Sequence, residues 1–176
     1  MGKISVREIV LSGLFIALGI ILPMVFHVFG SGSTFLPMHI PVLIAGFVVS
    51  APFAIAVGAI TPILSSLLTG MPPVFPVLPF MIFELATYGG VASLLYRKLN
   101  FNVYVSLVCS MIAGRIVSSI VVWGLATFFM AKLPNPIVFI AGAITQGIPG
   151  IIIQIIFIPA IIFSLNKSRL IVREGN

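Results

Sequence analysis

Charged side chains are scarce in this chain, and their scarcity excludes a water-soluble fold. Only 7% of the 176 residues are Asp, Glu, Lys or Arg, whereas a soluble domain carries about 25%. Hydrophobic residues make up 60% of the sequence, and the mean hydropathy is +1.30. A surface so poor in charge cannot face water, so we expect an integral membrane protein in a lipid bilayer.

Cysteine, histidine and acidic residues are also rare, which narrows the possible chemistry. The single cysteine, Cys109, lies within an apolar segment and excludes a disulfide framework or a thiolate metal cluster. No Asp, Glu or Cys lies near His27 or His39 in sequence to complete a metal site. The chain also lacks paired carboxylates, a Ser-His-Asp set and a phosphate-binding glycine motif. We therefore expect no catalytic site, no metal and no cofactor.

Apolar segments dominate the chain and predict an all-α polytopic membrane protein. Phe, Ile, Leu and Val recur without sustained alternation, which favours helices over an outer-membrane barrel. The first segment is too long for the apolar core of a cleavable signal. We predict one domain over residues 1–176 with six transmembrane helices, at about 8–30, 40–50, 52–69, 80–96, 103–129 and 137–165.

Proline and glycine are expected to interrupt the helices at three places. The tight turn at Ser50–Pro52 joins the second and third segments as a hairpin. The stretch Gly70–Pro79 is too rich in proline for a regular helix and is expected to form an ordered cover. Gly147, Pro149 and Gly150 are expected to break the last segment.

The net charge of +6 comes from short cationic clusters beside apolar segments, a pattern that sets membrane topology and does not indicate nucleic-acid binding. With six spans, both termini and the second and fourth connections share one side. The cations on that side are Lys3, Arg7, Arg97, Lys98, Lys167, Arg169 and Arg173, and the other side has only Lys132. The positive-inside rule therefore predicts that both termini are cytoplasmic.

Glu84 and Arg115 are charges within predicted spans, and such charges are functional candidates by default. At ~1.5 Å per residue, both lie ~10–20 Å below the outer face. They either pair with each other to hold two helices together, or at least one of them contacts a polar solute. The planar fork of Arg115 suits a carboxylate or a phosphate.

Other polar and aromatic residues are expected at a similar depth or in the outer loops. A few convergent polar groups in an apolar surround are typical of small-molecule sites. Buried Ser, Thr and Tyr side chains also often satisfy backbone carbonyls, so each member alone is weak evidence. The candidates are His39, Thr87, Tyr88, Ser119, Trp123, Asn135 and Gln146.

Gly13 and Ala17 stand four residues apart on the first helix, beside Ser12. This spacing predicts a smooth face on which another helix can approach closely. The helix that approaches this face either belongs to the same bundle or comes from a partner protein. The spacing alone does not decide between these two possibilities.

The stretch FLPMHIPVLIAGFVVSAPFAIAVGAITPILSSLLTGMPP resembles the second and third helices of S components of energy-coupling factor (ECF) transporters. Within it, HIPVLIAGF (His39–Phe47) is similar to the family's second helix. Gly13-x3-Ala17 falls where the family has an Ala-x3-Ala face, with Gly in place of the first Ala. The resemblance covers nearly the whole chain in span number, orientation and size.

The resemblance implies a vitamin-binding subunit in the plasma membrane of a prokaryote. Its implied partners are a transmembrane coupling subunit, docked on Gly13 and Ala17, and two cytoplasmic ATPases that hydrolyse ATP. The implied pocket lies near the outer face, between helices four to six, beneath lids at Ser31–His39 and Met71–Pro79. Its implied residues are His39, Glu84, Thr87, Tyr88, Arg115, Ser119, Trp123, Asn135 and Gln146.

The resemblance suggests pantothenate or a cobalamin-related compound as the cargo. A lone intramembrane arginine suits a carboxylate such as that of pantothenate. Nickel and cobalt relatives use an N-terminal histidine, whereas this chain has Gly2-Lys3, so a metal ion is not the expected cargo.

A stand-alone secondary transporter or channel for a small organic solute is the main alternative, and uptake without any ATPase would favour it. A membrane-embedded enzyme is a third possibility, against which the sparse acids and histidines weigh heavily.

Overall fold

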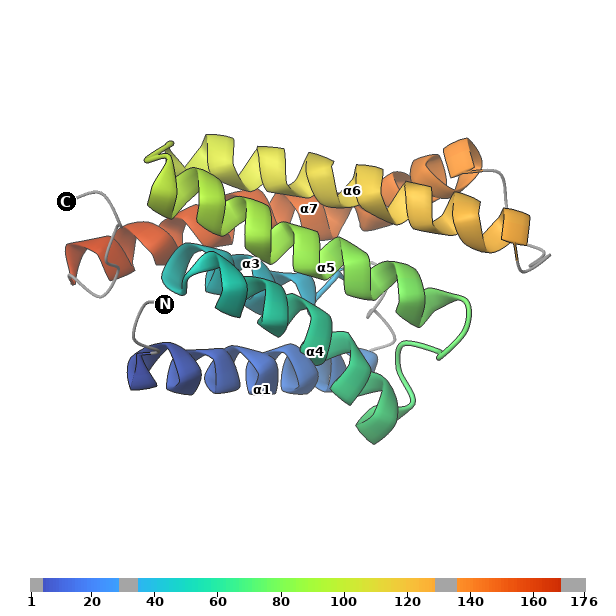
Figure 1. Ribbon diagram of the computed structural model, residues 1–176, viewed down its shortest axis with the longest axis horizontal. Helices are drawn as coiled ribbons and strands as arrows, with labels where there is room; N and C mark the ends of the chain where they lie inside the picture. The colour runs from blue at the N-terminus through green and yellow to red at the C-terminus, as the bar shows by residue number, and fades with distance from the viewer. Residues whose placement is uncertain (1–4, 29–34, 129–135, 169–176) are drawn as a thin grey trace.

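The computed structural model describes residues 5–28, 35–128 and 136–168, which form a helical bundle without strands in those ranges (Figure 1). This confirms the all-α prediction. The helices are α1 (Val6–Val28), α3 (His39–Val48), α4 (Ala51–Thr69), α5 (Val77–Ser93), α6 (Val103–Phe128) and α7 (Pro136–Lys167). A π-helical turn, η1 (Leu94–Lys98), continues α5.

Five of the described helices are long and apolar enough to cross a membrane, and α3 is the exception. With 10 residues, α3 extends ~15 Å, about half of the ~30 Å hydrocarbon core. Nine of its residues are buried. The predicted short second segment is therefore a helix enclosed by the bundle, and it does not reach the length of a span.

Two predicted helix limits need correction, and both involve proline. The predicted break at Gly147–Gly150 does not occur, because α7 runs without interruption through Pro149 and Pro159. In membrane helices, neighbouring groups can satisfy the carbonyls that a proline leaves free. The α5 helix begins at Val77, so Pro79 lies in its first turn. A proline there removes an N–H that has no helical partner anyway.

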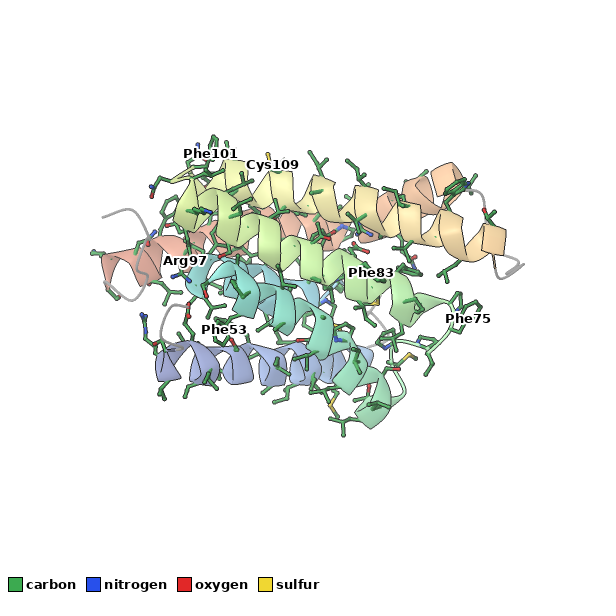
Figure 2. The ribbon with its side chains drawn as sticks, in the orientation of Figure 1. Phe53, Phe75, Phe83, Arg97, Phe101 and Cys109 are labelled. Carbon is green, nitrogen blue, oxygen red and sulfur yellow. The ribbon has the colours of Figure 1, made fainter. Side chains whose placement is uncertain are left out.

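Contacts at one end of the bundle agree with the predicted grouping of the connections. Glu8 at the start of α1 accepts a hydrogen bond from the backbone N–H of Ser50, in the α3–α4 turn, at 2.7 Å. Arg97 Nη1 lies 3.4 Å from the same Glu8 oxygen, and Asn166 near the end of α7 donates to the Tyr96 hydroxyl. Figure 2 shows Arg97 at this end and Phe75, in the α4–α5 loop, at the other.

The helices α4 and α5 approach each other so closely that only glycine fits at two positions. A Cβ at Gly58 would overlap the Leu85 carbonyl, and a Cβ at Gly89 would overlap the Ala54 carbonyl. The surrounding core is aliphatic and aromatic, with Val42, Leu43, Phe47, Val57, Leu85 and Tyr96 fully buried. This packing fixes α5, and with it the acid and the tyrosine that α5 carries into the interior.

Candidate functional site

Three side chains from α3, α5 and α6 converge on one carboxylate oxygen inside the bundle. The carboxylate belongs to Glu84 of α5, whose side chain is only 2% exposed. Tyr88, one turn further along α5, donates its hydroxyl to Glu84 Oε1 at 2.7 Å. Arg115 Nη1 lies 3.0 Å from that oxygen, and His39 Nε2 lies 3.6 Å from it. We call these four residues the Glu84 cluster.

Arg115 is the member of the Glu84 cluster that is most open to its surroundings. Its side chain is 17% exposed, and Glu84 is its only ion-pair partner within the described ranges. The ion pair compensates a carboxylate that would be very costly to bury alone. A Cβ at Gly147 of α7 would lie 3.9 Å from Arg115 Nη2 and 3.0 Å from Leu36 Cδ1. Gly147 therefore lets α7 pass close both to the guanidinium and to the Leu36 side chain.

His39 enters the cluster from the first residue of α3. Its backbone N–H donates to the Leu36 carbonyl at 3.0 Å, which sets the start of the helix. The residue is 4% exposed, and its ring centroid lies 5.5 Å from that of Tyr88. Neither ring nitrogen has a hydrogen-bond partner among the described residues. The imidazole would form an ion pair with Glu84 only if it were protonated.

Gly114 allows α6 to reach this cluster. A Cβ at this position would overlap the Tyr88 ring and lie 3.0 Å from the Glu84 carbonyl oxygen. Without a side chain at Gly114, α6 packs directly on α5, and the next residue, Arg115, reaches Glu84. The glycine thus determines the distance between the two charged helices.

An open cavity of about 550 Å³ lies between α5, α6 and α7, with Arg115 among its lining residues. Several of its aliphatic lining residues, such as Ile116 on α6, are themselves exposed. Its walls are mainly aliphatic, and its polar lining residues are Tyr88, Arg115 and Ser119. The Tyr88 hydroxyl already donates to Glu84, and the Ser119 hydroxyl donates to the Arg115 carbonyl. The guanidinium keeps N–H groups besides the one that pairs with Glu84, while the cavity wall itself is almost entirely apolar. Concave apolar walls with a few fixed polar groups are typical of small-molecule sites.

Residues 7–162 match the sequence model of a family described as "ECF transporter, substrate-specific component". The chain belongs to this family. Comparisons with curated proteins and with solved structures found no match. An ECF substrate-specific component, or S component, is an integral membrane subunit that binds substrate and is not an enzyme. The five membrane-capable helices agree with this assignment.

The S component brings some of the predicted site residues together. His39, Glu84, Tyr88 and Arg115 form the cluster, and Ser119 lines the adjacent cavity. The sequence allows two alternatives for Glu84 and Arg115: they pair with each other, or at least one of them contacts a polar solute. The structure shows them paired. Arg115 of this pair also lines the cavity, whereas Glu84 does not.

The remaining predicted site residues within the described ranges are not among those that line the cavity. Thr87 donates its hydroxyl to the Phe83 carbonyl at 2.7 Å, and the side chain of Trp123 is exposed on α6. Gln146 is exposed on α7. None of these three residues lines the described cavity. Asn135 lies outside the described residues, as do residues 31–34 of the predicted first lid.

Gly114, Gly147 and Leu36 shape the site and were not predicted from the sequence. Gly114 immediately precedes the intramembrane arginine, and that adjacency was a usable signal, because a charge in a membrane helix needs a close partner. Gly147 had been interpreted as a helix breaker. Its contact with Leu36 joins segments more than 100 positions apart in sequence, and the sequence gives no sign of it.

The face of α1 that carries Gly13 and Ala17 points away from the rest of the S component. Both residues are exposed, and a Cβ at Gly13 would meet nothing within 4 Å. Ser12, beside Gly13 in sequence, is buried, so it lies on the flank of the helix that packs on the bundle. Of the two possible uses of this small-residue face, packing within the described bundle is therefore not the one observed.

Proposed function

We propose that this S component captures a small water-soluble vitamin or vitamin precursor from outside a prokaryotic cell, for import through an ECF-type transporter. The observation that carries the proposal is the placement of Arg115. Its guanidinium is anchored to the buried Glu84, and its side chain lines an open apolar cavity. The volume of about 550 Å³ is within the range of small-molecule sites, ~300–1,000 Å³.

The orientation of the bundle supports capture from outside. By sequence, seven cations belong to the end that holds Glu8, Ser50 and Arg97, and one belongs to the other end. Under the positive-inside rule, the first end is cytoplasmic. Glu84 lies seven residues from the other end of α5, a depth of ~10 Å at the helical rise.

Pantothenate is the first candidate cargo, and a cobalamin-related compound is the second. The single carboxylate of pantothenate matches a single guanidinium, which can bind two oxygens at once. A cavity of this volume also suits a compact acid better than a corrin macrocycle. Cargo contacts from His39, Ser119 and the outer residues Thr87, Trp123, Asn135 and Gln146 remain part of the proposal.

The proposed partners are a transmembrane coupling subunit and two cytoplasmic ATPases. The exposed Gly13–Ala17 face offers the coupling subunit a surface on which helix backbones can approach closely. ATP hydrolysis would take place on the ATPases, because the S component is a binding subunit.

Binding by the purified S component and uptake by vesicles together test this function. We expect Arg115→Met to weaken the affinity for the bound vitamin about 10–100-fold, since a charge-assisted hydrogen bond contributes about 1.5–3 kcal/mol. Lys98→Met, at an exposed cation on the cytoplasmic end, is the matched control and should leave the affinity unchanged. Uptake should require the coupling subunit, both ATPases and ATP. Equal uptake without the ATPases would instead indicate a stand-alone transporter.

A further inference from the structure

The Glu84 cluster has one anion, one permanent cation and one group that can become a cation. Glu84 and Arg115 compensate each other at 3.0 Å. His39 stands on the other side of the same oxygen, at 3.6 Å, and is 4% exposed. With a neutral imidazole the cluster has no net charge, and with a protonated imidazole its net charge is +1.

An anionic cargo at Arg115 changes this balance, because two carboxylates would then share one guanidinium. Two carboxylates that both contact one guanidinium lie close together, and like charges repel strongly in a poorly solvated site. Only 2% of the Glu84 side chain is exposed, so water does little to screen the repulsion. A second positive charge close to Glu84 would remove the penalty and leave more of Arg115 for the cargo.

His39 is the only described group that can supply this charge next to Glu84. The helices packed against α3 are α1, α4, α5 and α7. Of these, α4 has no titratable residue, α7 has only Lys167 at its far end, and Arg7 and Glu8 of α1 lie at the far end of α3. The side chain of His27 is outside the described residues. From α5, Glu84 and Tyr88 face His39, and both are acids.

The hydrogen bonding of His39 suits a group that gains a proton. Tyr88 is already committed as a donor to Glu84 at 2.7 Å. Within the described ranges the two ring nitrogens of His39 have no partner. A protonated Nε2 would donate to Glu84 Oε1 and turn a contact of 3.6 Å into a charge-assisted hydrogen bond.

We propose that this S component binds its cargo as a monoanion together with one proton, and that His39 holds the proton against Glu84. The inference rests on the proposed function and specifies the charge of the cargo. His39 then determines specificity through charge: a cation gains nothing from a protonated His39, and a dianion is left with one uncompensated charge. Affinity for the acid should therefore fall as the pH rises, by up to about tenfold per pH unit.

Calorimetry on the full-length protein in nanodiscs measures the proton directly. Pantothenate, biotin and nicotinate are the acidic probes, and pyridoxine and thiamine are the neutral and cationic ones. Each titration is repeated at one alkaline pH in phosphate and in Tris, whose ionisation heats differ, so that the number of protons taken up per bound vitamin is obtained. We expect an acidic probe to bind with uptake of close to one proton.

Three variants distinguish a proton on His39 from a structural role. In His39→Gln we expect no proton uptake and a pH-independent, weaker affinity. In Glu84→Gln we expect the acid to bind without proton uptake, because the competing carboxylate is gone. His27→Gln, at the other histidine, should behave like the parent protein. Thermal melting verifies that each variant is folded.

The outcomes separate this inference from the proposed function. An acid that binds without proton uptake overturns the inference and leaves the proposed function intact. Tight binding of thiamine or pyridoxine alone has the same effect. Undiminished proton uptake in a folded His39→Gln variant also overturns the inference. If His39→Gln does not fold, undiminished proton uptake in Glu84→Gln has the same consequence. Failure of every vitamin to bind counts against both.

Discussion

Glu8 and Arg97 are 89 positions apart in the sequence, yet Arg97 Nη1 lies 3.4 Å from Glu8 Oε1. The same oxygen accepts the Ser50 N–H at 2.7 Å, and Arg97 also donates to the Val48 carbonyl at 3.2 Å. One carboxylate therefore joins the start of α1, the α3–α4 turn and the π-helical turn η1. The small-residue face of α1 is exposed, so α1 is held on the bundle by its other contacts. The Glu8 junction is one of these contacts.

Removing the Glu8 charge should loosen α1. We expect Glu8→Gln to lower the stability of the S component by about 1–2 kcal/mol, because a charged hydrogen bond is lost at a partly buried position. The measurement is the thermal midpoint in detergent, followed by size-exclusion chromatography. Lys98→Gln, at the exposed cation next to Arg97, is the control and should leave the midpoint unchanged. An equal loss in both variants would show that the junction contributes nothing specific.

A methyl group at Gly114 should disturb the proposed cargo site. The Gly114→Ala side chain would overlap the Tyr88 ring, so α5 and α6 must separate or Tyr88 must leave Glu84. We expect a loss of about 1–3 kcal/mol in stability, the usual cost of overpacking, and a weaker affinity for the vitamin. The matched variant is Gly124→Ala on the same helix, where a Cβ meets nothing within 4 Å. It should match or slightly exceed the parent in stability, because alanine favours helix. Identical behaviour of the two variants would contradict the close contact.

Composition and hydropathy were enough to predict the helices, because each apolar segment must satisfy its backbone internally in a bilayer. They did not reveal that α3 is enclosed, since a ten-residue apolar helix looks the same whether it faces lipid or protein. Nor did they indicate that α7 continues through Pro149, because the effect of a proline depends on its neighbours.

The charged members of the site were predictable, whereas the orientation of most polar ones was not. Glu84 and Arg115 stand out because a membrane interior tolerates a charge only beside a partner. Trp123 and Ser119 lie one turn apart on α6, yet Trp123 is 58% exposed and Ser119 borders the cavity. In a membrane helix most faces are apolar, so the hydrophobic pattern does not distinguish the side that faces lipid from the side that lines the cavity.

Bulky side chains on the exposed face of α1 should block transport without affecting capture. We expect Gly13→Trp and Ala17→Trp to abolish vitamin uptake by the assembled transporter and to leave the affinity of the isolated S component unchanged, because nothing in the described bundle packs on Gly13. Gly142→Trp, at another exposed glycine with free space around its Cβ, controls for added bulk and should retain uptake. Pull-down of the coupling subunit measures the docking directly. Uptake that survives both α1 substitutions would remove this face from the docking surface.

Cysteine labelling of intact cells should show the α4–α5 loop outside and the η1–α6 turn inside. In a Cys109→Ser background, Met71→Cys and Leu99→Cys each place one thiol at an exposed position. They lie in the two loops that hold Phe75 and Phe101, which Figure 2 shows at opposite ends of the bundle. An impermeant maleimide should label Met71→Cys at once, and should label Leu99→Cys only after the membrane is permeabilised. The expectation follows from the cation distribution, from which the positive-inside rule predicts a cytoplasmic Arg97–Lys98 end. The reverse pattern would place the end of the bundle nearer to Glu84 on the cytoplasmic side. Capture of a vitamin from outside would then be untenable, even if the affinity were high.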